Sequence, residues 1–398
     1  MQHLLDVFGF LSVLLRGAEI TTQSFLCGGL VFLLFVVKPA TPAFGNLGPA
    51  LTARCRICLQ WSAIAFALAA AALLATDSSV LGAGTDLALA DIAGADFFLA
   101  GATAIAAALI MLWGSRRRAT DRIAPYLLIP GAVVLLASAL TSHAAARLEY
   151  RSALITLDFL HQAAAAVWIG GILYFLACLQ LCRADAFAFA TVCARFSRVA
   201  LIAVIVLFLA GFGMSLVYID SLAALYGTAY GVMLTAKVIF FALLLTLGFF
   251  NNRITARLQH DTAAPAYRLM RFAEVEIGIG LTVLFLAASF TSQPPAVDLK
   301  DQRVTLAQIE ARVAPQLPTL VSPNHASLAI SQLQKKPDAE ADRDAKPSAP
   351  AYVPGGGIAP PSNAADILWS EYNHHWSGLF VLVIGLLGMA EKTRRARW

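Results

Sequence analysis

Runs of apolar residues long enough to cross a membrane recur along almost the whole chain. A membrane-spanning helix needs about 20 consecutive apolar residues, and only 13% of the residues are charged, against about 25% in soluble domains. Residues 4–15 are expected to extend the first helix or to lie on the membrane interface. The sequence therefore predicts an all-α, polytopic transmembrane bundle of about nine spans, near 17–37, 57–75, 97–113, 125–141, 153–178, 197–217, 230–250, 272–290 and 370–390.

Basic residues concentrate in alternate loops between these runs and in the C-terminal tail. By the positive-inside rule, this places the N-terminus on the outer, periplasmic side and the C-terminus on the inner, cytoplasmic side. The net charge of +5 thus sets orientation and indicates no nucleic-acid binding. No cleavable signal peptide is expected, since no basic segment precedes the first run. The basic positions are Arg54, Arg56, Arg116, Arg117, Arg118, Arg122, Arg195, Arg198, Arg253, Arg257, Arg268, Arg271, Lys392, Arg394, Arg395 and Arg397.

Composition divides the chain into three parts. Residues 1–291 form the predicted membrane bundle. Residues 292–367 are rich in Pro, Ala, Lys and Asp, and such a segment buries too little apolar surface to offset its ordering entropy. We expect it to be a disordered periplasmic linker. Residues 368–398 hold the last span and a basic cytoplasmic tail.

Two segments of the bundle resemble each other. "EITTQSFLCGGLVFLL" (19–34) aligns with "HQAAAAVWIGGILYFL" (161–176) at an offset of 142, and "TARCR" (52–56) resembles "CARFSR" (193–198). Because the first and fifth spans run in the same direction, this is a possible parallel internal repeat. Small residues also recur wherever helices pack closely, which is the simpler interpretation.

A histidine lies within the fifth apolar run, in "DFLHQ". Ionisable groups inside a span are costly and usually mark a function, which makes His161 the leading candidate site residue. Asp158 shares its helix face and could fix the ring tautomer. Glu19 occupies the matching position of the repeat.

Other potential metal ligands map to the same outer side. Imidazole combined with thioether or carboxylate suits copper. Adjacent helical residues point about 100° apart, so at most one of His374 and His375 faces the bundle. In the alternative interpretation the histidines are interfacial and the methionines only pack. The candidate metal ligands are His143, His161, His374, His375, Met214 and Met233.

Five cysteines map to the inner ends of the spans, which predicts a thiol exit site for copper. Thiols facing the cytoplasm stay reduced, and soft thiolates select Cu(I). The alternative is that each is a small buried hydrophobe. These residues are Cys55, Cys58, Cys178, Cys182 and Cys193.

Two further charges lie within spans. Lys237 is near the outer end of the seventh span and Glu276 near the inner end of the eighth, so they are not expected to pair directly. Lys237 could snorkel or neutralise Asp158. Proton coupling could use Glu19, Asp158 or Glu276.

Several stretches resemble the copper resistance protein D (CopD) family. They are "SHAAA" (142–146), "LDFLHQAAAAVWIGGILYF" (157–175), "ARFSRVALIAVIVLFLAGFGMSLVYI" (194–219), "YGVMLTAKVIFFALLLTLGFFNNR" (230–253) and "EVEIGIGLTVLFLAASFTSQPP" (274–295). The resemblance covers about 140–295, with His143, His161, Lys237, Asn252 and Glu276 at the family's polar positions. It implies a non-enzymatic inner-membrane copper protein that moves copper inward and is served by a periplasmic copper-binding partner.

Two other functions stay open at this stage. "HQAAAAVWIGG" also resembles membrane b-type cytochromes, in which haem takes axial histidines from facing helices, so a haem-binding redox protein is an alternative. A copper-delivery factor for a respiratory oxidase is another. No Walker-type phosphate loop is present, and the sequence does not indicate the oligomeric state.

Overall fold

The computed structural model describes residues 2–85, 89–117, 120–258, 266–314, 320–323 and 364–392. The chain divides into two compact units, Met1–Thr305 and Leu306–Trp398. All regular elements among the described residues are helices. This confirms the prediction of an all-α membrane protein.

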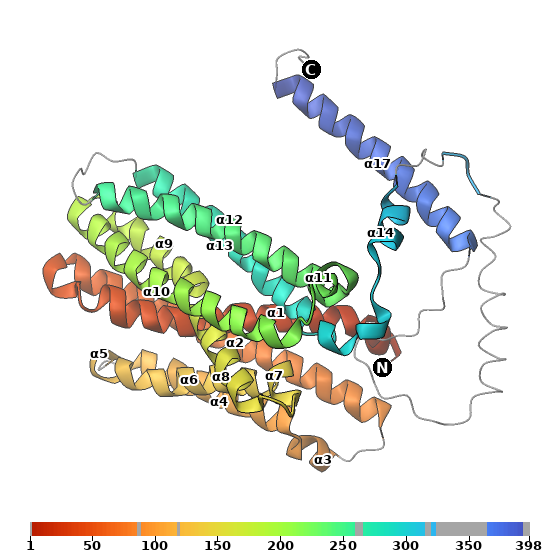
Figure 1. Cartoon of the computed structure of the whole chain (residues 1–398). Coiled ribbons are helices and arrows are strands. Elements are labelled where there is room, and N and C mark those ends of the chain that lie inside the picture. Colours follow the sequence, from red (N-terminus) through yellow and green to blue (C-terminus); the bar gives the residue numbers. More distant parts are fainter. Residues whose placement is uncertain are drawn as a thin grey trace. The chain divides into compact units, whose positions relative to one another are not determined.

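Each of the nine predicted apolar runs lies in a helix (Figure 1). Among the described residues, eight helices are long and apolar enough to cross a membrane, and Ala124–Leu140 is a shorter apolar helical segment. Residues 4–15 belong to the first helix. The elements of the spans are α1 (Gln2–Phe32) with η1 (Leu33–Val37), α2 (Leu47–Gly84), α4 (Asp96–Arg116), η3 (Ala124–Leu127) with α6 (Leu128–Leu140), α8 (Arg151–Ala165) with η4 (Ala166–Gly170) and α9 (Gly171–Cys182), α10 (Ala186–Tyr218), α12 (Ala229–Leu258), α13 (Ala266–Phe290) and α17 (Ala364–Lys392).

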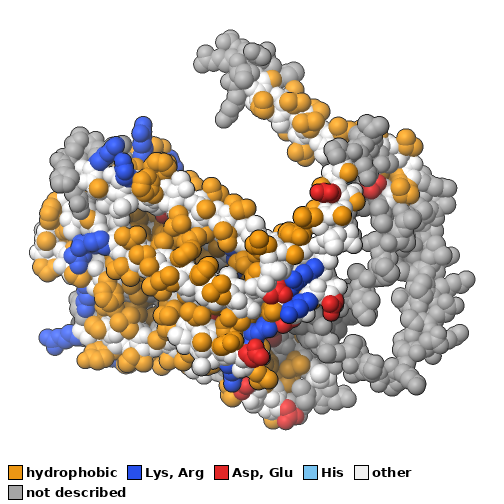
Figure 2. All heavy atoms as spheres, viewed as in Figure 1, with side chains coloured by type: hydrophobic (Ala, Val, Ile, Leu, Met, Phe, Trp, Pro, Cys, Tyr) orange, Lys and Arg blue, Asp and Glu red, His pale blue; other side chains and the backbone are white. Residues whose placement is uncertain are grey.

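Short helices occupy several connections between these spans. They are α3 (Leu89–Gly94), α5 (Thr120–Ile123), α7 (His143–Ala146) and α11 (Leu222–Gly227). Helices suit a bilayer because each satisfies its own backbone hydrogen bonds where no water can. In Figure 2 hydrophobic side chains cover most of the visible bundle surface.

Lys and Arg side chains gather at the end of the bundle where α9 meets α10 and α12 meets α13 (Figure 2). We call this the inner end, since the positive-inside rule assigns it to the cytoplasm, and the opposite end the outer end. Acidic and basic side chains mix at the outer end. Of the predicted inner positions, Arg118, Arg394, Arg395 and Arg397 lie outside the described residues.

The first and fifth spans cross in the middle of the bundle at glycines. A Cβ atom on Gly28 of α1 would overlap the carbonyl oxygen of Ala166 in η4. A Cβ atom on Gly170 of η4 would overlap the carbonyl oxygen of Ser24 in α1. Only glycine lets the two backbones approach this closely.

This crossing is reciprocal under the offset of 142 that relates the two sequence segments. Gly28 corresponds to Gly170, and Ser24 corresponds to Ala166. Gly28 contacts Ala166 on the fifth span, and Gly170 contacts Ser24 on the first span. Phe32 and Tyr174, which also correspond, lie with ring centroids 6.3 Å apart. These reciprocal contacts agree with the predicted parallel repeat.

Residues 292–305, which composition assigns to the linker, belong to the bundle unit. They form two short turns, η5 (Ala296–Asp298) and η6 (Lys300–Gln302). The Arg303 guanidinium pairs with Asp220 at 2.6 Å and also donates to the Ala296 carbonyl. These bonds, which composition does not reveal, hold the segment at the outer end; we call 292–305 the outer turns.

The second unit contains α14 (Leu306–Val313) and α17. Most side chains of α17 from Leu368 to Glu391 are exposed within the unit, as expected of a span whose neighbours are lipids. Residues 324–363, the main part of the predicted disordered linker, lie outside the described residues. The predicted division into a bundle, a linker and a last span therefore stays a prediction.

Candidate metal-binding sites

The His161 side chain forms a hydrogen bond with the backbone of α10. The Nδ1 atom of the ring lies 3.2 Å from the carbonyl oxygen of Leu207. A carbonyl oxygen only accepts, so Nδ1 carries the proton and Nε2 keeps the lone pair that a metal ion would use. Gly211 provides the space, because a Cβ atom there would lie 3.1 Å from Cε1 of the ring.

Asp158 takes a different partner from the one predicted. Its Oδ2 atom accepts a hydrogen bond from Gln162, at 3.1 Å, and Gln162 in turn accepts one from Gln23 of α1, at 3.0 Å. The expected bond that fixes the His161 tautomer comes from Leu207 instead. Asp158 thus begins a polar chain between the first and fifth spans, and it acts on His161 through its charge.

Lys237 approaches the same group of residues from α12. Its Nζ atom lies 3.5 Å from the centre of the Phe290 ring, a cation–π contact. It is also within electrostatic range of Asp158 and His161. None of the ion pairs among the described residues joins Lys237 to Asp158. The two groups therefore interact through longer-range electrostatics without direct contact.

His143 begins the short helix α7 at the outer end. The Nε2 atom of its ring is buried without a hydrogen-bond partner. Burial lowers the pKa of the His143 imidazole below its ordinary value, which favours the neutral form that binds metals. Asp158 is within electrostatic range of His143 as well as of His161.

Glu19 has its ionic partner on its own helix. Its carboxylate pairs with Arg16, one turn earlier on α1, at 2.8 Å. Asp77 of α2 lies within electrostatic range of both. Since Arg16 is three residues away on the same helix, this local pair forms more easily than a contact across the bundle.

The other predicted outer ligands lie in three places. Met214 packs against an apolar cluster around Tyr218 and Tyr230, and Met233 is partly buried on α12. His374 and His375 belong to the second unit, where Nδ1 of His374 bonds to the Ser370 carbonyl of its own helix at 2.7 Å. Among the described residues, no three His, Cys, Asp or Glu side chains converge as a ready metal site.

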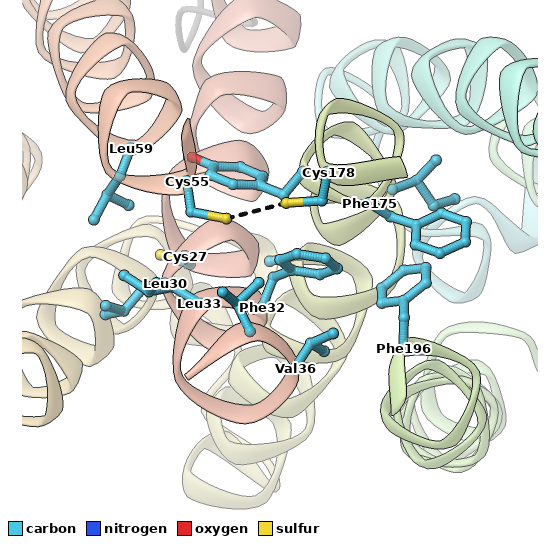
Figure 3. Packing of buried hydrophobic residues seen from close by; sticks show 14 of the residues in the cluster. Cys27, Leu30, Phe32, Leu33, Val36, Cys55, Leu59, Phe175, Cys178 and Phe196 are labelled. Atoms are coloured by element: carbon cyan, nitrogen blue, oxygen red, sulfur yellow. Dashed lines mark hydrogen bonds between the residues drawn. The ribbon is translucent and has the colours of Figure 1, made fainter. Parts of the chain in front are cut away.

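Two of the inner cysteines, in contrast, do come together. The Sγ atoms of Cys55 on α2 and Cys178 on α9 lie 3.4 Å apart, although 123 positions separate the residues. In Figure 3 the two side chains point toward each other within the apolar core. Both are free thiols and both are buried. The pair was not predictable from spacing, because the residues lie on different spans.

The remaining cysteines lie around this pair. Cys58 and Cys182 are each within electrostatic range of Cys178, and Cys193 is within range of Cys182. Near them, the Tyr174 hydroxyl bonds to Ser62 at 3.0 Å. The structure therefore gathers all five predicted thiols at the inner half of the bundle.

A cavity of about 220 Å³ opens beside the inner ends of α10, α12 and α13. Glu276 lies in its lining and accepts a hydrogen bond from Asn251, at 2.6 Å. Ser197 and Asn252 line it too and bond to each other at 2.9 Å. Sequence reasoning identified Glu276 but missed Asn251, for which the "NN" pair inside an apolar run was the available signal.

Comparisons with known proteins connect this geometry to copper. Residues 190–290 match the family model of copper resistance protein D, which confirms the resemblance over that segment. The chain is also 38% identical over 164 residues to the copper transport protein CutJ of Bacillus subtilis (strain 168). That match covers 40% of this chain and 29% of the relative, so the two share less than a third of the relative's length. No solved structure matches.

Proposed function

We propose that this multi-pass protein moves copper across the bacterial inner membrane, because residues 190–290 match the family model of copper resistance protein D. Copper would bind at the outer end through imidazole nitrogen and leave at the inner end through thiol sulfur. The chain carries out no covalent chemistry in this proposal. The metal is its cargo.

The buried thiol pair is the observation that carries the proposal. Cys55 and Cys178 present two sulfur atoms to each other from different spans, and soft thiolates favour Cu(I) over harder cations. Binding would displace the thiol protons, since only the thiolate is a metal ligand. The nearby hydroxyls of Tyr174 and Ser62 bond to each other, and neutral hydroxyl oxygens are poor ligands for Cu(I) beside thiolates.

The outer end supports copper entry less directly. His161 keeps Nε2 free for a metal because Nδ1 bonds to Leu207, and His143 has a buried, unpartnered Nε2 atom. Asp158 provides a negative charge within range of both rings. A cation arriving from outside would meet imidazole ligands there first and thiols later.

Inward movement follows from this order of ligands. Imidazole binds both oxidation states of copper, whereas thiolates hold Cu(I) in a reducing compartment. A soluble periplasmic copper protein would deliver the ion to the outer end. The two repeat-related spans, which cross at Gly28 and Gly170, would rock against each other to pass it on.

The test is Cu(I) uptake into sealed vesicles reconstituted with the full chain and loaded with an internal Cu(I) indicator, under anaerobic reducing conditions. We expect the unmodified protein to support uptake and the double variant Cys55→Ser, Cys178→Ser to lose at least 90% of the rate, on the order of tenfold or more as for other changes of metal ligands.

Cys27→Ser is the matched control, because Cys27 is also buried and its Sγ bonds only weakly, to the Gly131 carbonyl at 3.6 Å. It should transport like the unmodified protein. Uptake at an unchanged rate in the double variant would remove the thiol site from the pathway. A correctly folded protein that moves no copper in either direction would end the transport proposal and leave copper delivery.

A further inference from the structure

Glu276 is a carboxyl group buried in the inner half of the bundle without a cation beside it. Its side chain is 5% exposed, and none of the ion pairs among the described residues includes it. The two other acidic groups that sequence analysis linked to protons differ in this respect. Glu19 pairs with Arg16, and Asp158 lies within range of Lys237. Glu276 alone among these three candidates lacks a balancing charge.

The other side chains that line the cavity with Glu276 are neutral. From α12 the cavity lining includes Asn251, Asn252 and Thr255, and from α10 it includes Ser197 and Cys193. The fifth span contributes Trp168, Ile172 and Phe175. Cys193 is the one other titratable group in that lining, and it is a buried free thiol. An ionised carboxylate in this setting is costly, so the protonated form is favoured.

Asn251 is arranged for a protonated partner. Its Nδ2 group donates to Oε1 of Glu276 at 2.6 Å, while its Oδ1 atom is buried and has no hydrogen-bond partner. A protonated Glu276 can donate its O–H group to that oxygen and complete a paired acid–amide contact. A carboxylate has no proton to give, and it would leave the Asn251 oxygen unsatisfied.

The cavity gives a proton a route to this pair. It holds about 220 Å³, which is room for several water molecules. Its polar lining lies toward the inner ends of α12 and α13, near the basic inner surface of the bundle. Water in the cavity could therefore carry protons between Glu276 and the inner end of the bundle, where Asn252 and Thr255 lie.

We infer that Glu276, Asn251 and the adjoining cavity form a proton-binding site that opens to the cytoplasm and takes up or releases one proton for each copper ion moved. The ligand is the proton itself, bound as the O–H of the Glu276 carboxyl group. The coupling to copper rests on the proposed function, whereas the proton site does not depend on it.

The first experiment detects the protonated carboxyl group and uses no copper. The full chain in lipid nanodiscs is treated with dicyclohexylcarbodiimide, an apolar reagent that adds to a protonated carboxyl group, whose proton moves to a carbodiimide nitrogen. Peptide mass spectrometry should find the label on Glu276 at neutral pH and less of it as the pH rises. Glu276→Gln should remove this label.

Glu274→Gln is the matched control, because Glu274 lies two residues away and is exposed and paired with Arg271 at 2.7 Å. In this variant, the extent of carbodiimide labelling of Glu276 should equal that in the unmodified protein. Absence of label on Glu276 at every pH, or labelling that does not change with pH, would overturn the proton site.

The second experiment tests the coupling. In the sealed vesicles, a proton gradient directed against or along copper uptake should change the uptake rate of the unmodified protein and of Glu274→Gln at least fivefold. Glu276→Gln should bind Cu(I) with unchanged affinity and lose this gradient dependence. If the uptake rate of the unmodified protein is the same with and without the proton gradient, the coupling is wrong. If no variant moves copper, the proposed function fails, and the carbodiimide labelling still decides the proton site.

Discussion

The backbone of Gly170 lies 3.0 Å from the position that a Cβ atom on Gly28 would occupy. These two glycines correspond in the internal repeat, and each also approaches a backbone carbonyl of the other span. Their contact fixes the crossing of the first and fifth spans. The polar outer residues lie on one side of this crossing and the thiols on the other.

Replacing Gly170 by alanine should destabilise the bundle, because the added methyl group would overlap the Ser24 carbonyl. Overpacking of a tight core costs about 1–3 kcal/mol, which outweighs the gain of up to about 1 kcal/mol in helix propensity. The midpoint of thermal unfolding in detergent should fall. Gly278→Ala is the control, since a Cβ atom there meets nothing within 4 Å, and its midpoint should hold or rise.

Gly211→Ala should disturb His161 without unfolding the protein. The new methyl group would lie 3.1–3.2 Å from the imidazole ring and push it away from Leu207. Loss of an orienting contact typically weakens metal binding about 10–100-fold. An anaerobic Cu(I) titration against a competing chelator measures this change. Gly213→Ala, where the methyl group meets Leu157 at 3.2 Å instead, should bind like the unmodified protein; equal losses in both variants would count against His161.

Arg303→Ala should release the outer turns from the bundle. The guanidinium donates to the Asp220 carboxylate, the Ser221 hydroxyl and the Ala296 carbonyl. Hydrogen exchange of 292–305 should become faster, while exchange within α10 stays slow. Arg303→Lys should restore little, because an ammonium group cannot reproduce the planar fork.

The same contact should depend on pH. Partial desolvation raises the pKa of Asp220, but the hydrogen bond and charge of Arg303 lower it more, so this pKa lies below its ordinary value. A carboxylate with a lowered pKa stabilises the fold above its unfolded pKa and loses that contribution as the pH falls through the folded pKa. Exchange of the outer turns should therefore quicken only below about pH 4, and Asp220→Asn should abolish that change.

A reduced-minus-oxidised absorption spectrum of the purified protein separates copper transport from the haem alternative. Under the copper proposal we expect no haem band from cells grown with adequate iron, although the Nε2 atom that His161 leaves free could ligate either metal. A b-type signal near stoichiometric with protein, and lost in His161→Ala, would make this a redox protein instead.

The sequence by itself determined the helices, the candidate ligands and the family segment. A stretch of about 20 apolar residues must satisfy its own backbone bonds in a bilayer, so each span could be identified from its own composition. His161 and Glu276 stood out for the same local reason, as charges in apolar runs. The partners of those residues could not be identified in this way.

Only the tertiary structure decided which groups meet. Leu207 rather than Asp158 holds His161, Cys55 faces Cys178, and Asn251 faces Glu276. The Cys55–Cys178 contact joins spans that are far apart in the sequence, whereas the other two join consecutive spans. They depend on how helices pack around the glycine crossing. Helices in a membrane associate through complementary shape and close approach, because their hydrophobicity hardly differs from that of the lipid. The hydropathy of a span therefore does not predict which helix it packs against.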